Sequence, residues 1–116
     1  MITRIYVVAG RNNSGTWLNS IEFLDITHKR TTADRWFIFT VKELSPRLNP
    51  AVSRISATQI VIMGGYGDQK LSDIILVDTK THEGSVALTN CGKMFTCWAN
   101  TTLFGKNTVY SLVEEG

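Results

Sequence analysis

The decisive stretch of the sequence is Gln59-Ile60-Val61-Ile62-Met63-Gly64-Gly65-Tyr66-Gly67-Asp68. Its apolar residues run without interruption into a pair of glycines. Such a run, bounded by a turn signal, is typical of a strand that is buried on both faces. Adjacent glycines let the backbone turn sharply and let another segment approach closely. The stretch therefore predicts a buried strand whose end packs against a different part of the chain.

The same arrangement occurs earlier in the chain. Arg4-Ile5-Tyr6-Val7-Val8-Ala9-Gly10-Arg11-Asn12-Asn13 aligns with it residue by residue, with Ala9 in the place of Gly64, and Gly10 and Gly65 are 55 residues apart. The following segment also repeats, since Leu18-Asn19-Ser20-Ile21-Glu22-Phe23-Leu24-Asp25 matches Leu71-Ser72-Asp73-Ile74-Ile75-Leu76-Val77-Asp78. A repeat of about 50 residues built from short strands favours the blades of a β-propeller.

The repeated features resemble those of the kelch family. They are a buried strand that ends in Gly-Gly, a variable loop, a strand of the form Leu-Asn-Ser-Ile-Glu-x-x-Asp, a tryptophan and a later Pro-Arg. The resemblance covers nearly the whole chain, although Ser85 lies near the expected tryptophan position and Val77 where the family usually has tyrosine. It implies an all-β fold, namely a partial β-propeller of antiparallel four-stranded kelch-like blades. It also implies structural roles for Gly10, Asp25, Trp36, Arg47, Gly64, Gly65 and Asp78.

By this resemblance the chain divides into three units. Residues 1–44 form a blade that lacks its first strand, residues 45–90 a second blade, and residues 91–116 the first half of a third. Pro46 and Pro50, the two prolines of the chain, mark the crossover between the first two units. Propellers usually close with about 4–8 blades, so the sequence predicts a piece of a larger ring; a swapped oligomer is the alternative. We expect strands over residues 5–10, 20–26, 35–41, 51–56, 59–65, 73–79, 85–89, 94–98, 102–104 and 108–113.

Composition and charge narrow the classes of function. The formal net charge is +2, so no strong attraction to nucleic acid or to acidic lipid is expected. No apolar run approaches the ~18 residues that span a bilayer, and no secretory signal is visible at the start of the sequence. We therefore expect no nucleic-acid partner, no membrane and a cytoplasmic location. Cys91 and Cys97 fit neither a redox motif nor a zinc site, and we interpret them as reduced thiols.

Catalytic motifs are weak in this sequence. His28 and His82 lie at equivalent turns and are interpreted as solvated turn residues, and no Gly-x-Ser-x-Gly nucleophile motif is present. The glycines of residues 64–67 are not followed by the Lys-Ser/Thr of a phosphate loop. Asp25 and Asp78 recur at matching positions, which favours a role in capping turns by accepting backbone N–H bonds. We therefore expect a protein that is not an enzyme, with no cofactor and no metal.

The leading hypothesis is a non-catalytic protein-protein interaction module. The alternatives are a piece of a propeller-based enzyme whose catalytic residues lie in other blades, and a scaffold segment within a larger assembly. Trp17 either clamps the blade edge or contacts a partner. The loops that follow the second strand of each blade would form one face, with the candidate partner-binding residues Arg11, Asn12, Asn13, Trp17, Tyr66, Asp68, Gln69 and Lys70. Open blade edges also predict self-association.

Overall fold

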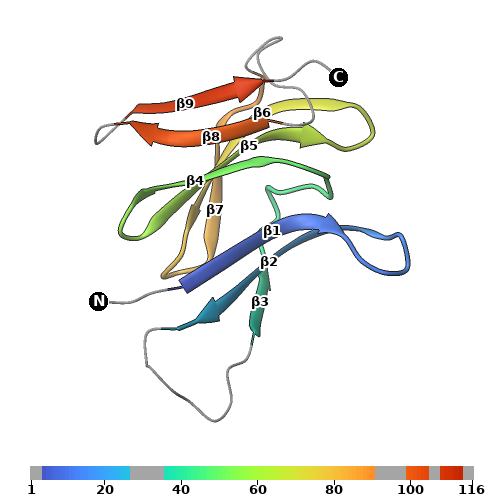
Figure 1. Ribbon diagram of the computed structural model, residues 1–116, viewed down its shortest axis with the longest axis horizontal. Coiled ribbons are helices and arrows are strands. Elements are labelled where there is room, and N and C mark those ends of the chain that lie inside the picture. The colour runs from blue at the N-terminus through green and yellow to red at the C-terminus, as the bar shows by residue number, and fades with distance from the viewer. Residues whose placement is uncertain (1–3, 27–35, 91–98, 105–107, 114–116) are drawn as a thin grey trace.

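The computed structural model describes residues 4–26, 36–90, 99–104 and 108–113, and these contain β-strands and no α-helix (Figure 1). The all-β fold expected from the sequence is thereby confirmed. The strands are β1 (Arg4–Arg11), β2 (Trp17–Asp25), β3 (Trp36–Thr40), β4 (Ala51–Ser56), β5 (Gln59–Tyr66), β6 (Lys70–Asp78), β7 (Glu83–Leu88), β8 (Ala99–Phe104) and β9 (Thr108–Val113).

The strands form three antiparallel sheets, each built from one continuous part of the chain. The first sheet has the order β1-β2-β3, the second the order β4-β5-β6-β7, and β8 pairs with β9. Within the described residues the three-stranded and four-stranded sheets are open, because neither has its outermost strands paired with each other. In Figure 1 the second sheet lies between the first sheet and the β8–β9 hairpin, with β8 beside β4.

The internal repeat of the sequence corresponds to a repeat of the backbone. Val8 pairs with Ile21 and Gly10 with Leu18, and the matching pairs in the second sheet are Met63 with Ile74 and Gly65 with Leu71. Both ladders are interrupted by a bulge at the same place, between Val8 and Gly10 and between Met63 and Gly65. β1 on β2 and β5 on β6 are therefore two copies of one hairpin, with the same register and the same bulge.

The bulge explains the glycine pair. Gly64 and Gly65 have φ values of 60° and 101°, and Ala9 and Gly10 have nearly the same values, 59° and 103°. Positive φ is readily accessible to glycine and is strained for a residue with a Cβ atom. The conformation at Ala9 shows that the bulge is kept in the first sheet even where one glycine is replaced.

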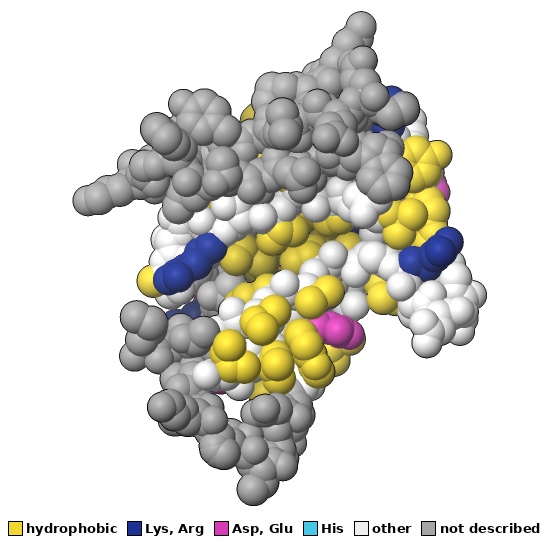
Figure 2. Space-filling model, in the orientation of Figure 1, with side chains coloured by type: hydrophobic (Ala, Val, Ile, Leu, Met, Phe, Trp, Pro, Cys, Tyr) yellow, Lys and Arg dark blue, Asp and Glu magenta, His cyan; other side chains and the backbone are white. Residues whose placement is uncertain are grey.

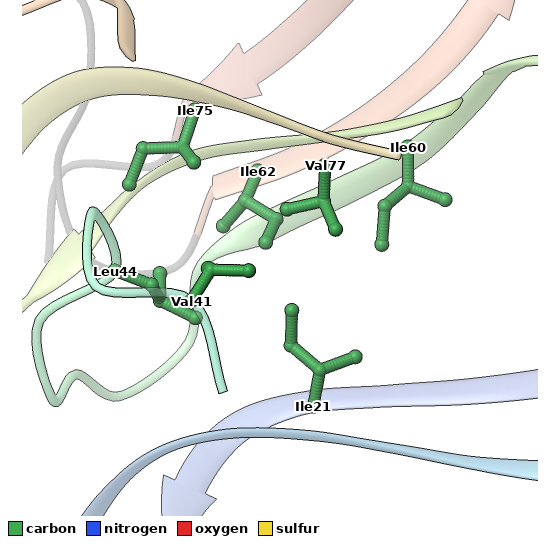
Figure 3. Close-up of a cluster of buried hydrophobic side chains, with 7 residues drawn as sticks. All are labelled: Ile21, Val41, Leu44, Ile60, Ile62, Ile75 and Val77. Carbon is green, nitrogen blue, oxygen red and sulfur yellow. The ribbon is translucent and has the colours of Figure 1, made fainter. Parts of the chain in front are cut away.

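The main hydrophobic core lies between the first and second sheets (Figure 3). Ile21 of the first sheet points toward Ile62 and Val77 of the second sheet (Figure 3), and all three side chains are 0% exposed. Alternate residues of β5 and β6 point to this side because successive side chains of a strand point to opposite faces. Val41 and Leu44, which follow β3, close the same cluster. The connection from the first sheet to the second is thus part of the core.

A second cluster lies on the other face of the second sheet. It contains Ala51, Val61 and Met63, with Ile74 and Leu76 packed against it. These residues come from the strand positions between those of the main core, so β5 is buried on both faces, as the unbroken apolar run predicts.

Several strand boundaries differ from those expected. β2 begins at Trp17 instead of residue 20, because pairing continues beyond the bulge to Arg11. β7 begins at Glu83, inside the expected turn, because Glu83 pairs with Asp78. β8 begins at Ala99, ahead of the expected residue 102. The strand expected at residues 94–98 lies outside the described residues.

The outer face of the first sheet is exposed. The side chains of Trp36 and Ile38 on this face of β3 are 49% and 64% exposed. The second sheet covers only the opposite face, to which Phe39 belongs. Trp36 therefore lies on an exposed face of β3 in the described part of the chain.

Candidate functional site

Two hairpin ends lie at the same end of the first and second sheets. The β1–β2 turn begins after the pair Arg11 and Trp17, and the β5–β6 turn begins after the pair Tyr66 and Lys70. These pairs occupy equivalent positions beyond the two bulges. Both turns therefore leave their sheets in the same way, and both carry residues of the predicted partner-binding set.

The crossover segment 45–50 holds the two hairpin ends together. The backbone N–H of Gly10 donates to the carbonyl oxygen of Arg47 at 2.9 Å, and the N–H of Arg47 donates to Leu18 at 3.2 Å. The next residue, Leu48, exchanges two backbone hydrogen bonds with Tyr66, at 2.8 and 2.9 Å. A single extended segment thus bonds to the first sheet through one residue and to the second sheet through the next.

Trp17 and Tyr66 meet across this junction. Their ring centroids are 5.8 Å apart with an interplanar angle of 59°, a tilted arrangement that is favourable for aromatic pairs. The Tyr66 side chain is 37% exposed, and Trp17 is half-buried. The contact joins the two turns into one surface, which we call the loop surface; its residues are Arg11, Asn12, Asn13, Trp17, Tyr66, Asp68, Gln69 and Lys70.

The six polar residues of the loop surface divide into two groups. Asn12 is used inside its own turn, because its Oδ1 accepts the backbone N–H groups of Ser14 and Thr16, each at 3.0 Å. Gln69 supplies a backbone carbonyl that accepts the N–H of Gly67 at 2.9 Å. In the described residues, no hydrogen bond or ion pair engages the exposed side chains of the second group, namely Arg11, Asn13, Asp68 and Lys70.

Beneath the loop surface the buried Arg47 forms an ion pair with Asp73, whose side chain is partly exposed. Arg47 is 0% exposed, and its guanidinium donates to both carboxylate oxygens of Asp73, at 2.7 and 2.9 Å. The same guanidinium donates to the carbonyl oxygens of Gly64 and Ser45. Arg47 was expected from the Pro-Arg pattern, whereas no local signal pointed to Asp73, which is 26 residues away in the chain.

Gly65 also lies close to the crossover segment. A Cβ atom at Gly65 would lie 2.7 Å from the carbonyl oxygen of Leu48 and 3.1 Å from the backbone of Pro50. Because this neighbour is backbone that is itself hydrogen-bonded to Tyr66, it cannot easily move aside. Gly65 thus permits the close approach that positions the loop surface.

The opposite ends of the sheets carry a different arrangement. His82, in the turn between β6 and β7, stacks on Phe39 of the first sheet, with centroids 4.0 Å apart and an interplanar angle of 6°. Phe23 lies beside both rings, and the guanidinium of Arg4 lies 4.6 Å above the Phe23 ring. His82 is exposed as expected, but it also makes a contact between sheets that its sequence position did not indicate. His28 lies outside the described residues.

The two repeated aspartates end equivalent strands. Asp78 Oδ1 accepts the backbone N–H groups of Lys80 and Thr81, at 2.8 and 2.9 Å, and thereby caps the turn after β6. These bonds, that of Thr81 first, hold the pKa of the Asp78 carboxyl below its usual value. Asp25 lies 3.6 Å from Nε of Arg4, while the turn that follows it lies outside the described residues.

The described part of the chain contains no group of three or more His, Cys, Asp or Glu residues that could hold a metal ion. It also contains no helix long and apolar enough to cross a membrane. Comparison with known proteins does not assign the chain to a family: it matches no protein-family model and no curated protein sequence.

Proposed function

We propose that the chain is a segment of a kelch-like β-propeller and acts as a non-catalytic protein-protein interaction module. The repeated hairpin supports the propeller, because its two copies share register, bulge and backbone angles. The stacking of consecutive sheets supports it too, since one face of the first sheet packs on one face of the second. Sheets related in this way can continue in the same direction and bury each face against the next.

The contact between Trp17 and Tyr66 carries the proposal for the binding site. It brings two aromatic rings from successive sheets together on the loop surface. Aromatic residues and arginine are enriched among the side chains that dominate binding energy at protein interfaces. The partner in this proposal is a protein segment that packs on Tyr66 and reaches the side chains around it.

The charged groups of the loop surface suit a partner of mixed polarity. Arg11 and Lys70 supply positive charge, and Asp68 supplies a carboxylate. Because these exposed side chains make no hydrogen bond or ion pair within the described residues, they can pair with a partner without first breaking internal contacts. Charges at the rim of an interface mainly set the rate of association and its salt dependence.

The test is quantitative binding between the full chain and a protein partner identified by cross-linking to the loop surface. We expect Tyr66→Ala and Arg11→Ala each to weaken binding by about 1–2 kcal/mol, because tyrosine and arginine are enriched among the side chains that dominate binding energy at interfaces. Lys80→Ala, in an exposed turn at the other end of the second sheet, is the matched control and should leave the affinity unchanged.

Circular dichroism and thermal melting of each variant separate lost binding from lost folding. Equal effects of Tyr66→Ala, Arg11→Ala and Lys80→Ala on the affinity, with the fold intact in all three, would remove the assignment of the loop surface. A partner that cross-links only at the opposite end of the sheets, near His82, would also contradict it.

A further inference from the structure

The outer edge of β1 has no strand beside it in the described part of the chain. β1, β2 and β3 correspond to β5, β6 and β7, since the ladders of β1 on β2 and of β5 on β6 share their register. In the second sheet β4 pairs with the other edge of β5. The first sheet has the order β1-β2-β3, so no strand among the described residues takes the place that corresponds to β4. An unpaired strand edge presents backbone N–H and C=O groups that can pair with another strand.

The main core is also incomplete along the same edge. Its residues from β5 and β6 are buried, whereas Tyr6 and Val8 of β1 and Val52 of β4 are only partly buried. The corresponding β5 residues, Val61 and Met63, are 4% and 5% exposed. Figure 2 shows hydrophobic side chains in a hollow on the surface between the regions of β1 and β4. A strand beside β1 would cover this hollow.

We propose that the free edge of β1 binds an extended polypeptide strand in antiparallel orientation, in the place that β4 occupies beside β5. The bound strand continues the first sheet by backbone hydrogen bonds, which is the β-augmentation mode of peptide recognition. The β4–β5 ladder supplies the register. Ala51 pairs with Met63, Val52 with Ile62 and Ser53 with Val61, which correspond to Val8, Val7 and Tyr6 of β1.

The chemistry of the bound strand follows from this register. Strand residues opposite Tyr6 and Val8 point toward the second sheet, in the way that Ser53 and Ala51 point toward the β8–β9 side of their own sheet. Val52 of β4 faces the same hollow from the second sheet. Because Val52 already takes up part of this space, small side chains fit at the two positions opposite Tyr6 and Val8. The residue opposite Val7 lies on the outer face beside an exposed apolar side chain, so a β-branched apolar residue fits. The site thus selects a strand in which a β-branched residue stands between two small ones.

The first test uses a fluorescent synthetic peptide with the sequence of residues 51–57, which has this pattern. Two further versions of the peptide carry methyl groups on backbone nitrogens. One version is methylated at the residues that correspond to Ala51, Ser53 and Ile55. The other is methylated at the residues that correspond to Val52 and Arg54. Because the N–H groups of a strand alternate between its two edges, only one version can still donate to β1. We expect that version to bind like the unmodified peptide and the other to bind at least about tenfold more weakly.

The second test locates the peptide by disulfide trapping in a chain that carries Cys91→Ser and Cys97→Ser. A peptide with Val52→Cys should cross-link faster to Val7→Cys than to Ile5→Cys, because only Val7 lies opposite that residue in the proposed register. Val7 and Ile5 are 46% and 47% exposed, which makes them a matched pair. Tyr66→Ala should leave peptide binding unchanged, so this proposal and the loop surface are tested separately.

Three outcomes would overturn the proposal. They are the absence of peptide binding, equal binding by the two N-methylated versions, and equal cross-linking at Val7 and Ile5. Dimers of the chain that dissociate when the unmodified peptide is added would support the proposal, because a second copy of the chain would then occupy the same edge of β1.

Discussion

The side chain of Arg47 reaches from the crossover segment to Asp73 in β6 and holds both of its carboxylate oxygens, although Arg47 itself is fully buried. The pair joins the crossover to the second sheet directly beneath the contact between the crossover and both hairpin ends. A buried guanidinium is tolerated only where its charge is paired and its N–H groups are bonded. Here the additional acceptors are the carbonyl oxygens of Gly64 and Ser45.

Removing the carboxylate should therefore destabilise the fold strongly. We expect Asp73→Ala to lower the free energy of unfolding by about 3 kcal/mol, because it leaves a buried charge without its counter-ion. Urea denaturation measures the effect. Asp68→Ala, which removes an exposed carboxylate with no ion pair in the described residues, is the control and should change the free energy by less than about 0.5 kcal/mol.

A double-mutant cycle tests whether the pair acts as a unit. If Arg47 and Asp73 are coupled, Asp73→Ala should cost less in an Arg47→Met background than in the wild type, by about 1–3 kcal/mol. Strictly additive effects would show that the loss in Asp73→Ala arises from packing and not from the ion pair.

Substitutions at the two bulge glycines distinguish the cost of backbone strain from the cost of a steric clash. Gly10 and Gly65 have φ values of 103° and 101°, but a Cβ atom at Gly10 would meet nothing within 4 Å, whereas one at Gly65 would meet Leu48 at 2.7 Å. We expect Gly10→Ala to cost about 1–2 kcal/mol from strain alone, and Gly65→Ala to cost about 2 kcal/mol more. Thermal or urea unfolding of both variants provides the comparison. Similar losses in the two would contradict the close approach of the crossover.

Ala9 offers the reverse substitution. Its φ of 59° is one that glycine adopts without strain, so Ala9→Gly should leave the free energy of unfolding unchanged or raise it by up to about 1 kcal/mol. A clear loss of stability in Ala9→Gly would mean that the methyl group contributes more through packing than it costs through strain.

The cap at Asp78 predicts a dependence on pH. Because the backbone N–H groups of Thr81 and Lys80 lower its pKa below the usual value of 3.8, the carboxylate contributes stability that is fully present above that pH. The contribution is lost as the pH falls through the lowered pKa of the folded state. The difference in thermal midpoint between the wild type and Asp78→Ala should therefore be largest near neutral pH and should shrink below about pH 3.8. A difference that stays constant from neutral to acidic pH would contradict a role of the charged form.

The exposed face of the first sheet predicts self-association. Ile5 and Val7 are 47% and 46% exposed, whereas their counterparts in the second sheet, Ile60 and Ile62, are 5% and 0% exposed because the first sheet covers them. Ile38, at 64% exposed, belongs to the same uncovered face. We expect the chain to associate at micromolar concentrations and Ile38→Lys to reduce this without loss of stability. Analytical ultracentrifugation measures both, and a monodisperse wild-type monomer would refute the prediction.

Local signals were sufficient for most of the strands. The apolar run before Gly64 predicts β5, and the alternation and turn residues around it predict β4 with the boundaries observed. The repeat between residues 4–25 and 59–78 predicts the equivalence of the two hairpins because both copies keep the apolar positions and the glycine of the bulge. Strand ends were less predictable, since β2 and β7 are lengthened by pairing with a neighbour and not by their own residues.

The sequence by itself determined the strand content and the repeat of the hairpin, because these depend on side-chain alternation and on the positions of the glycines. Only the tertiary structure decided that Trp17 meets Tyr66, that Arg47 pairs with Asp73 and that His82 stacks on Phe39. Each of these contacts joins residues far apart in the chain and depends on how one sheet packs on the next. That packing is fixed by the shared core between the sheets, which no local pattern encodes.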